Sequence, residues 1–107
     1  MLFINENNNV VVRNDKIIFD MGNELFLFRI EEIRSISLTT TEQLLFKQKV
    51  FLTFVTDYDL FVMGIIHPAF KRVLKDVCER FDVDYRLVID AMQSDTQQTF
   101  ILYQGRE

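Results

Sequence analysis

The stretch HPAFKRVLKDVCERF (67–81) decides the fold class, because its apolar residues follow a different period from those of the segments before it. The apolar positions recur every three or four residues, at Phe70, Val73, Leu74, Val77, Cys78 and Phe81. This spacing builds one continuous stripe on an α-helix, and the charged residues between them fall on the opposite face. Pro68 suits a first helical turn, where its missing N–H would have no partner. The pattern predicts one amphipathic helix over about 68–81.

The segments on either side of residues 24–45 are typical of β-hairpins. The runs VVV (10–12) and KIIF (16–19) flank an Asn-Asp turn, which indicates two short strands. VFLTFVT (50–56) and LFVMG (60–64) flank DYD (57–59) in the same way. We therefore expect two antiparallel hairpins before the helix.

Between the hairpins, ELFLF (24–28) is apolar on both alternation faces, so we expect this strand to be covered on both sides. IEEIRSISL (30–38) alternates through its second half and predicts a turn that leads into a strand with one solvated face. The polar TTTEQ (39–43) is interpreted as a loop or the end of that strand.

The chain after the helix allows two interpretations. Residues 85–92 form either a strand or a short helix capped by Asp84, and the helix is favoured. SDTQQT (94–99) is expected to be a connector, and TFILYQ (99–104) a final strand. No internal repeat or linker is visible, so we expect a single α+β domain over 1–107.

Several stretches resemble the small bacterial pleckstrin-homology-like (PH-like, GRAM-like) domains. VVVRNDKIIFD (10–20) is similar to their opening hairpin, FRIEEIRSISL (28–38) to their central segment, and FLTFVTDYDLFVMG (51–64) with the following helix to their last hairpin and capping helix. The resemblance covers about residues 8–81. It implies an antiparallel, partly open barrel capped by one helix, to which this chain adds a C-terminal segment.

The basic loop that phosphoinositide-binding members of that family use is not repeated here, because the first hairpin offers Arg13 and Lys16 with Asp15 between them. Fold resemblance by itself does not specify a ligand.

Composition narrows the class of protein further. The chain has 107 residues, a hydrophobic fraction of 49% and a net charge of −4, so it is expected to fold around one core and to avoid nucleic acid and anionic membranes unless its cations cluster. It lacks an apolar run of the roughly twenty residues that span a bilayer. With one cysteine and no secretion-signal pattern at residues 1–9, we expect a soluble, cytoplasmic protein.

No catalytic constellation emerges from the chemically reactive residues. Cys78 lies on the apolar stripe and is interpreted as packing, whereas His67, before Pro68, is expected to cap the helix or face water. No metal-ligand spacing exists, and the three glycines (22, 64 and 105) cannot form a phosphate-binding loop, so we expect neither a metal nor a cofactor. We therefore expect a protein that is not an enzyme.

Two surface features remain open to interpretation. Lys47 and Lys49 either join Arg13 and Lys16 in a basic patch or, as favoured, protect an edge strand. Tyr58 in the DYD turn either is exposed and available for binding, as binding aromatics often are, or, as favoured, folds back on its own hairpin.

The leading hypothesis is a small, non-catalytic protein–protein interaction module that uses a sheet face or an edge, plausibly for self-association. This hypothesis is based on the amount of apolar strand surface, which is more than one helix can cover. The residues concerned are Phe26, Phe28, Phe51 and 100–103. The expected interaction residues are Asp57, Tyr58, Asp59, Phe100, Leu102 and Tyr103. The alternative is an acidic inhibitor or accessory protein, as from a phage or mobile element, that binds a nucleic-acid enzyme or another host protein.

Overall fold

The computed structural model describes residues 2–5, 9–22, 24–45, 48–93 and 96–105, which form an α+β fold. The strands are β1 (Leu2–Asn5), β2 (Asn9–Val12), β3 (Lys16–Asp20), β4 (Leu25–Arg29), β5 (Ser35–Leu45), β6 (Gln48–Val55), β7 (Leu60–Gly64) and β8 (Gln98–Gln104). The helices are the 3-10 turn η1 (Ile30–Glu32), α1 (Phe70–Arg80) and α2 (Tyr85–Met92).

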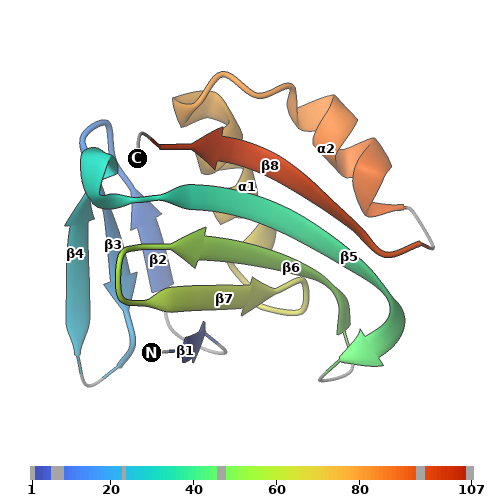
Figure 1. Cartoon of the computed structure of the whole chain (residues 1–107), viewed down its shortest axis with the longest axis horizontal. Coiled ribbons are helices and arrows are strands. Elements are labelled where there is room, and N and C mark those ends of the chain that lie inside the picture. The colour runs from blue at the N-terminus through green and yellow to red at the C-terminus, as the bar shows by residue number, and fades with distance from the viewer. Residues whose placement is uncertain (1, 6–8, 23, 46–47, 94–95, 106–107) are drawn as a thin grey trace.

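The described strands form two sheets (Figure 1). The large sheet has the order β1-β7-β6-β5-β8, and the small sheet has the order β2-β3-β4. β1 runs parallel to β7, and the other pairings are antiparallel. In Figure 1 the strands of the small sheet run across the direction of the large sheet. The predicted α+β class is confirmed, but the strands of the described chain do not close into a barrel.

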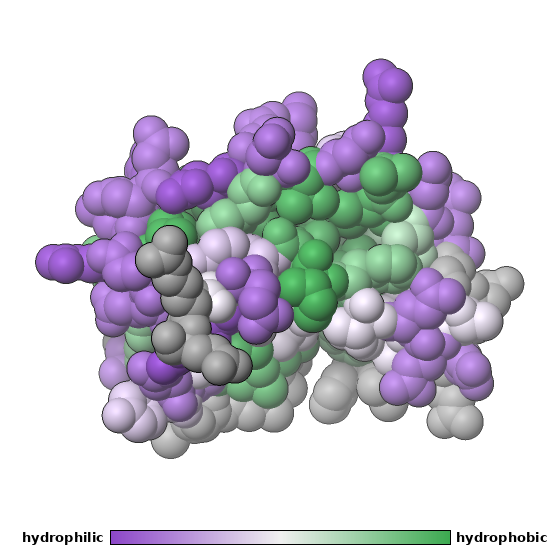
Figure 2. All heavy atoms as spheres, turned by 45° about the horizontal axis from the view of Figure 1, so that its top comes forward, coloured by the Kyte–Doolittle hydropathy of each residue, from purple (hydrophilic) through white to green (hydrophobic). Residues whose placement is uncertain are grey.

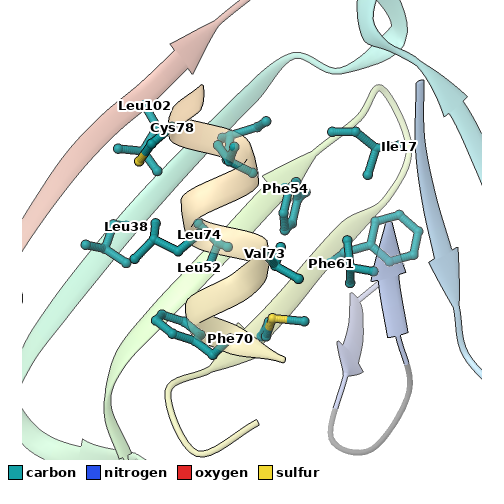
Figure 3. Packing of buried hydrophobic residues seen from close by; sticks show 14 of the residues in the cluster. Ile17, Leu38, Leu52, Phe54, Phe61, Phe70, Val73, Leu74, Cys78 and Leu102 are labelled. Carbon is teal, nitrogen blue, oxygen red and sulfur yellow. The ribbon is translucent and has the colours of Figure 1, made fainter. Parts of the chain in front are cut away.

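Helix α1 packs on the core through its apolar stripe. Phe70, Val73, Leu74, Val77 and Cys78 are all buried, as the three- and four-residue spacing predicts. Figure 3 shows Phe70, Val73, Leu74 and Cys78 on α1 beside the core, where Leu38 of β5 and Leu52 of β6 belong to the same cluster. Full burial of each large apolar side chain contributes about 1.5–3 kcal/mol, so this stripe is a main source of stability.

Local hydrogen bonds and backbone conformation explain where α1 begins and ends. The predicted start at 68 is two residues early, because His67 and Pro68 lie in a turn in which the His67 Nδ1 accepts a hydrogen bond from the Ala69 N–H at 2.9 Å. At the other end Asp82 has φ 57°, and the Val83 N–H donates to the Cys78 carbonyl at 2.8 Å. This is the left-handed C-terminal cap that stops a helix.

Phenylalanines join the two sheets. Phe19 of β3 contacts Phe54 and Phe61 of the large sheet with ring centroids 5.1 and 4.1 Å apart. Phe26 and Phe28 of β4 also meet Phe61, at 5.4 and 5.7 Å. The apolar surface in excess of what one helix can cover is therefore covered partly by packing between the two sheets.

The C-terminal segment completes the large sheet. α2 is a helix, as favoured, and its Asp84 side chain accepts a hydrogen bond from the Arg86 N–H at 2.9 Å. The predicted final strand is present as β8 and pairs antiparallel with β5. Of the expected connector 94–99, residues 94–95 lie outside the described part, and 98–99 belong to β8.

The segment 39–43 belongs to strand β5. Of its two interpretations, the end of the strand is confirmed and the loop is not, since Thr39 and Thr40 pair with Phe51 and Val50 of β6. On its other side Thr40 also pairs with β8, and its hydroxyl donates to the Thr96 carbonyl at 2.8 Å. Threonine is β-branched and suits a strand that is paired on both sides.

Candidate functional site

The outer face of the small sheet carries an apolar surface that nothing in the described chain covers. Along β4, Phe26 and Phe28 point to the core, whereas Leu25 and Leu27 point away from it. Leu25 is 68% exposed and Leu27 is 55% exposed, so the expectation that this strand is covered on both sides is wrong. Leu25 and Leu27 are neighbours on one face of the strand. Because both are largely exposed, they form a candidate contact surface.

The neighbouring strands extend this surface. The register places Val11 of β2 beside Ile18 of β3, and Ile18 beside Leu27 of β4. Val11 and Ile18 are half-buried. We call the four outward side chains of this face, Val11, Ile18, Leu25 and Leu27, the β4 surface.

Charges of opposite sign lie at the two ends of the β4 surface. At one end Lys16 pairs with Arg29, and the Arg13 N–H donates to the Lys16 carbonyl at 2.8 Å. At the other end Asp20 pairs with Leu25, which follows the exposed Glu24. The sequence interpretation noted Arg13 and Lys16 but missed Arg29, which only the hairpin pairing brings beside them.

Strand β4 is also an edge of the small sheet, since its one partner among the described strands is β3. The Met21 N–H donates to the Glu24 carbonyl and the Ile30 N–H to the Asp15 carbonyl, both at 2.9 Å, and these pairs bracket the β3–β4 ladder. Hydrogen-bonded pairs alternate along an antiparallel ladder, so the backbone groups of Leu25 and Leu27 point to the open edge. The Arg29 N–H, which points the same way, donates to the Glu32 carboxylate at 3.1 Å.

The expected interaction residues of the second hairpin lie in the β6–β7 turn. Tyr58 is 86% exposed, so the favoured interpretation, in which it folds back on its own hairpin, is wrong. The Asp57 carboxylate forms an ion pair with Arg34, and the Asp59 N–H donates to the Thr56 hydroxyl at 3.0 Å. Asp57 and Asp59 thus have structural partners in and beside the turn.

The expected residues of the last strand are less accessible. Leu102 is 6% exposed and belongs to the core, while Phe100 and Tyr103 are half-buried. The Tyr103 ring packs on Phe81, with centroids 4.3 Å apart. A register shift in the β5–β8 pairing, at which Leu102 has no partner on β5, lets the side chains at 102 and 103 both pack inward.

A second apolar area lies on the side of the molecule that carries α2 and β8. Figure 2 shows hydrophobic side chains grouped in the middle of this face and hydrophilic ones around them. Ile101 of β8 and Leu87 of α2 are 57% and 67% exposed. β8 is also an edge strand, since β5 is its one partner among the described strands, but Ile101 is its one exposed large apolar side chain in the described chain, whereas β4 has two.

A cleft of about 480 Å³ is lined by Asn14, Asp15, Ile30, Glu31, Arg80 and Tyr103. The Arg80 Nε donates to the Asn14 carbonyl at 2.6 Å, and its guanidinium lies 5.1 Å from the centre of the Phe81 ring. Asp15 and Glu31 are exposed, so the carboxylates of this cleft are open to solvent.

Cys78 and His67, the two side chains with reactive groups, lie in structural positions: Cys78 packs in the core and His67 caps a turn. Cys78 is 1% exposed, and burial, with a smaller contribution from the Asp84 carboxylate, raises the pKa of its thiol to about 11. His67 is buried and caps the turn before α1. Within the described residues, no group of three or more His, Cys, Asp and Glu side chains is placed to hold a metal ion.

The remaining charged residues are interspersed. On α1, Arg72 and Asp76 form an i,i+4 ion pair at 3.3 Å, so carboxylates are not segregated on that helix as an acidic inhibitor would require. Lys49 is exposed, and Lys47 lies outside the described residues. Among the described helices, none is long and apolar enough to cross a membrane.

Comparison with known proteins gives no relative: no family model matches the chain, and no curated protein or solved structure matches it significantly.

Proposed function

We propose that this chain is a small, non-catalytic protein–protein interaction module with a PH-like fold that binds through the β4 surface and the open edge of β4. The observation that carries the proposal is the exposure of Leu25 (68%) and Leu27 (55%) on an edge strand whose partner is β3 alone among the described strands. A cytoplasmic location remains part of this proposal.

The order of elements supports the PH-like part. A three-stranded antiparallel sheet precedes the consecutive strands β5, β6 and β7, and the amphipathic α1 follows and packs on both sheets. β1 and β8 then extend the large sheet at its two ends. These additions lie away from the β4 edge, so they leave the proposed binding surface open.

The chemistry of the edge favours a protein partner. An extended peptide can add to an open edge through the backbone groups of Leu25 and Leu27, while its side chains meet the β4 surface. Removing one leucine side chain from water contributes about 1.5–3 kcal/mol, so the two exposed leucines supply a substantial part of a binding energy. Small polar ligands would gain nothing from these side chains.

The test compares protein binding by three forms of the chain. Leu25→Lys places a charge on the β4 surface, and Leu87→Lys is a matched control because Leu87 on α2 is 67% exposed. We expect proteins retained by immobilised wild type, including further copies of this chain, to be retained by the control and lost with Leu25→Lys. Binding that is equal for all three forms, or no protein binding at all, would contradict the proposal.

A further inference from the structure

We propose that the partner at the β4 edge is β4 of a second copy of this chain, paired antiparallel about a two-fold axis at Phe26. This inference rests on the proposed function and names the partner of the same surface. It follows from three properties of β4, namely which backbone groups are open, which side chains would meet, and how charge is distributed along the strand.

The open backbone groups select the register. In a pairing centred on Phe26, Leu25 faces Leu27 of the second copy, and the N–H and carbonyl groups of both residues are all used. A pairing centred on Leu27 would need the Arg29 N–H, which already donates to the Glu32 carboxylate at 3.1 Å. The Phe26-centred register leaves this hydrogen bond intact.

The side chains match in the same register. Leu25 and Leu27 of each copy lie on the same outer face, so the four leucines form one continuous apolar strip across the axis. On the inner face the two Phe26 rings become neighbours, and in the single chain Phe26 is partly buried, in a T-shaped contact with Phe61. The pairing joins two small sheets into one continuous sheet and removes the open β4 edge of each copy.

Charge selects the antiparallel direction. The Arg29 end of β4 is basic, with Lys16 beside it, and the Leu25 end is acidic, with Asp20 beside it and Glu24 before it. An antiparallel partner brings the basic end of one copy to the acidic end of the other. A parallel partner would bring like charges together, which is unfavourable. This self-complementarity is what identifies a second copy, since both ends are satisfied at once.

The test measures self-association by sedimentation from low micromolar to submillimolar protein, together with amide hydrogen exchange of the wild type. We expect a monomer–dimer equilibrium and, as the protein concentration rises, slower exchange at Leu25 and Leu27. The Arg29 amide is the internal control, because its hydrogen bond to Glu32 is present in either state. Concentration-independent exchange at Leu25 and Leu27, or a monomer throughout, would overturn the inference.

Three variants locate the interface. Leu27→Pro removes an N–H that points to the open edge and leaves the hydrogen bonds between β4 and β3 in place, and Leu25→Lys adds a charge to the interface. Each of these two variants should raise the dissociation constant of the dimer at least tenfold. The control variant Leu87→Lys should leave the dissociation constant unchanged. Circular dichroism checks that each variant is folded. A dimer that survives both β4 variants overturns the inference.

Charge reversal tests the direction of pairing. Glu24→Arg and Arg29→Glu should each weaken self-association, and mixing the two variants should restore a heterodimer, since each basic end then meets an acidic one. If mixing gives no recovery, the antiparallel arrangement is wrong. A monomeric wild type that still binds another protein in a Leu25-dependent way would refute the second copy and leave the proposed function standing.

Discussion

Phe19 of β3 and Phe61 of β7 stack with their ring planes 5° apart and their centroids 4.1 Å apart, and this pair joins the small sheet to the large one. Phe28 and Phe54 make T-shaped contacts with Phe19, with ring centroids 6.0 and 5.1 Å apart. Because the small sheet is held on this side by aromatic rings, its opposite face is left in solvent. The position of the β4 surface therefore follows from the aromatic cluster behind it.

Phe61→Ala should lower the free energy of unfolding by about 3–5 kcal/mol, because it removes a buried ring and leaves a cavity between the sheets. Urea unfolding followed by circular dichroism measures the change. Tyr58→Ala is the control, since a side chain that is 86% exposed should change stability by about 0.5 kcal/mol or less. Equal effects of the two substitutions would show that the stack does not join the sheets.

Truncation of two adjacent residues of β8 should lower the free energy of unfolding by very different amounts. Leu102→Ala should cost about 2–5 kcal/mol, because Leu102 is 6% exposed and packed in the core. Ile101→Ala, at 57% exposure, should cost far less. Thermal unfolding of both variants makes the comparison, and a larger loss for Ile101 would mean that the register shift in the β5–β8 pairing is misplaced.

Replacing Asp82 by glycine should stabilise the fold, and replacing it by valine should destabilise it. Its φ of 57° is a conformation that glycine adopts without strain, so Asp82→Gly should stabilise the fold by about 0.5–1 kcal/mol. Asp82→Val should destabilise it by about 1–2 kcal/mol, the cost of a left-handed residue with a β-branched side chain. Chemical denaturation of the three proteins gives the ranking, and any other order contradicts the assigned helix cap.

Stability should fall in alkaline solution through Cys78. Burial raises the pKa of its thiol from 9.0 to about 11, so between these values the folded chain holds a proton that the unfolded chain has released. The stabilisation is complete below about pH 9 and decreases as the pH rises towards 11, because the folded state binds more protons.

Cys78→Ala provides the control for this pH dependence. Its free energy of unfolding should fall less steeply than that of the wild type over the same interval, and native wild type should resist thiol alkylation until it unfolds. Parallel pH profiles for the two proteins, or rapid alkylation of the native chain, would contradict the burial of the thiol.

Local sequence patterns determined the elements of this protein. The three- and four-residue spacing of Phe70 to Cys78 predicted α1 because that period reports a helix with one buried face, and alternation with turn residues predicted both hairpins. Asp84 likewise indicated the start of α2. These features depend on residues close in the chain, whose effects are readable from spacing alone.

Only the tertiary structure decided which faces are covered. In ELFLF the leucines and phenylalanines are equally apolar, and Phe26 and Phe28 are inward because Phe61, more than thirty residues later, provides a partner for them. The same long-range packing exposes Leu25 and Leu27, brings Arg29 beside Lys16, and turns Leu102 into the core. Spacing shows that a strand has an apolar face, but the element that covers this face comes from a distant part of the chain.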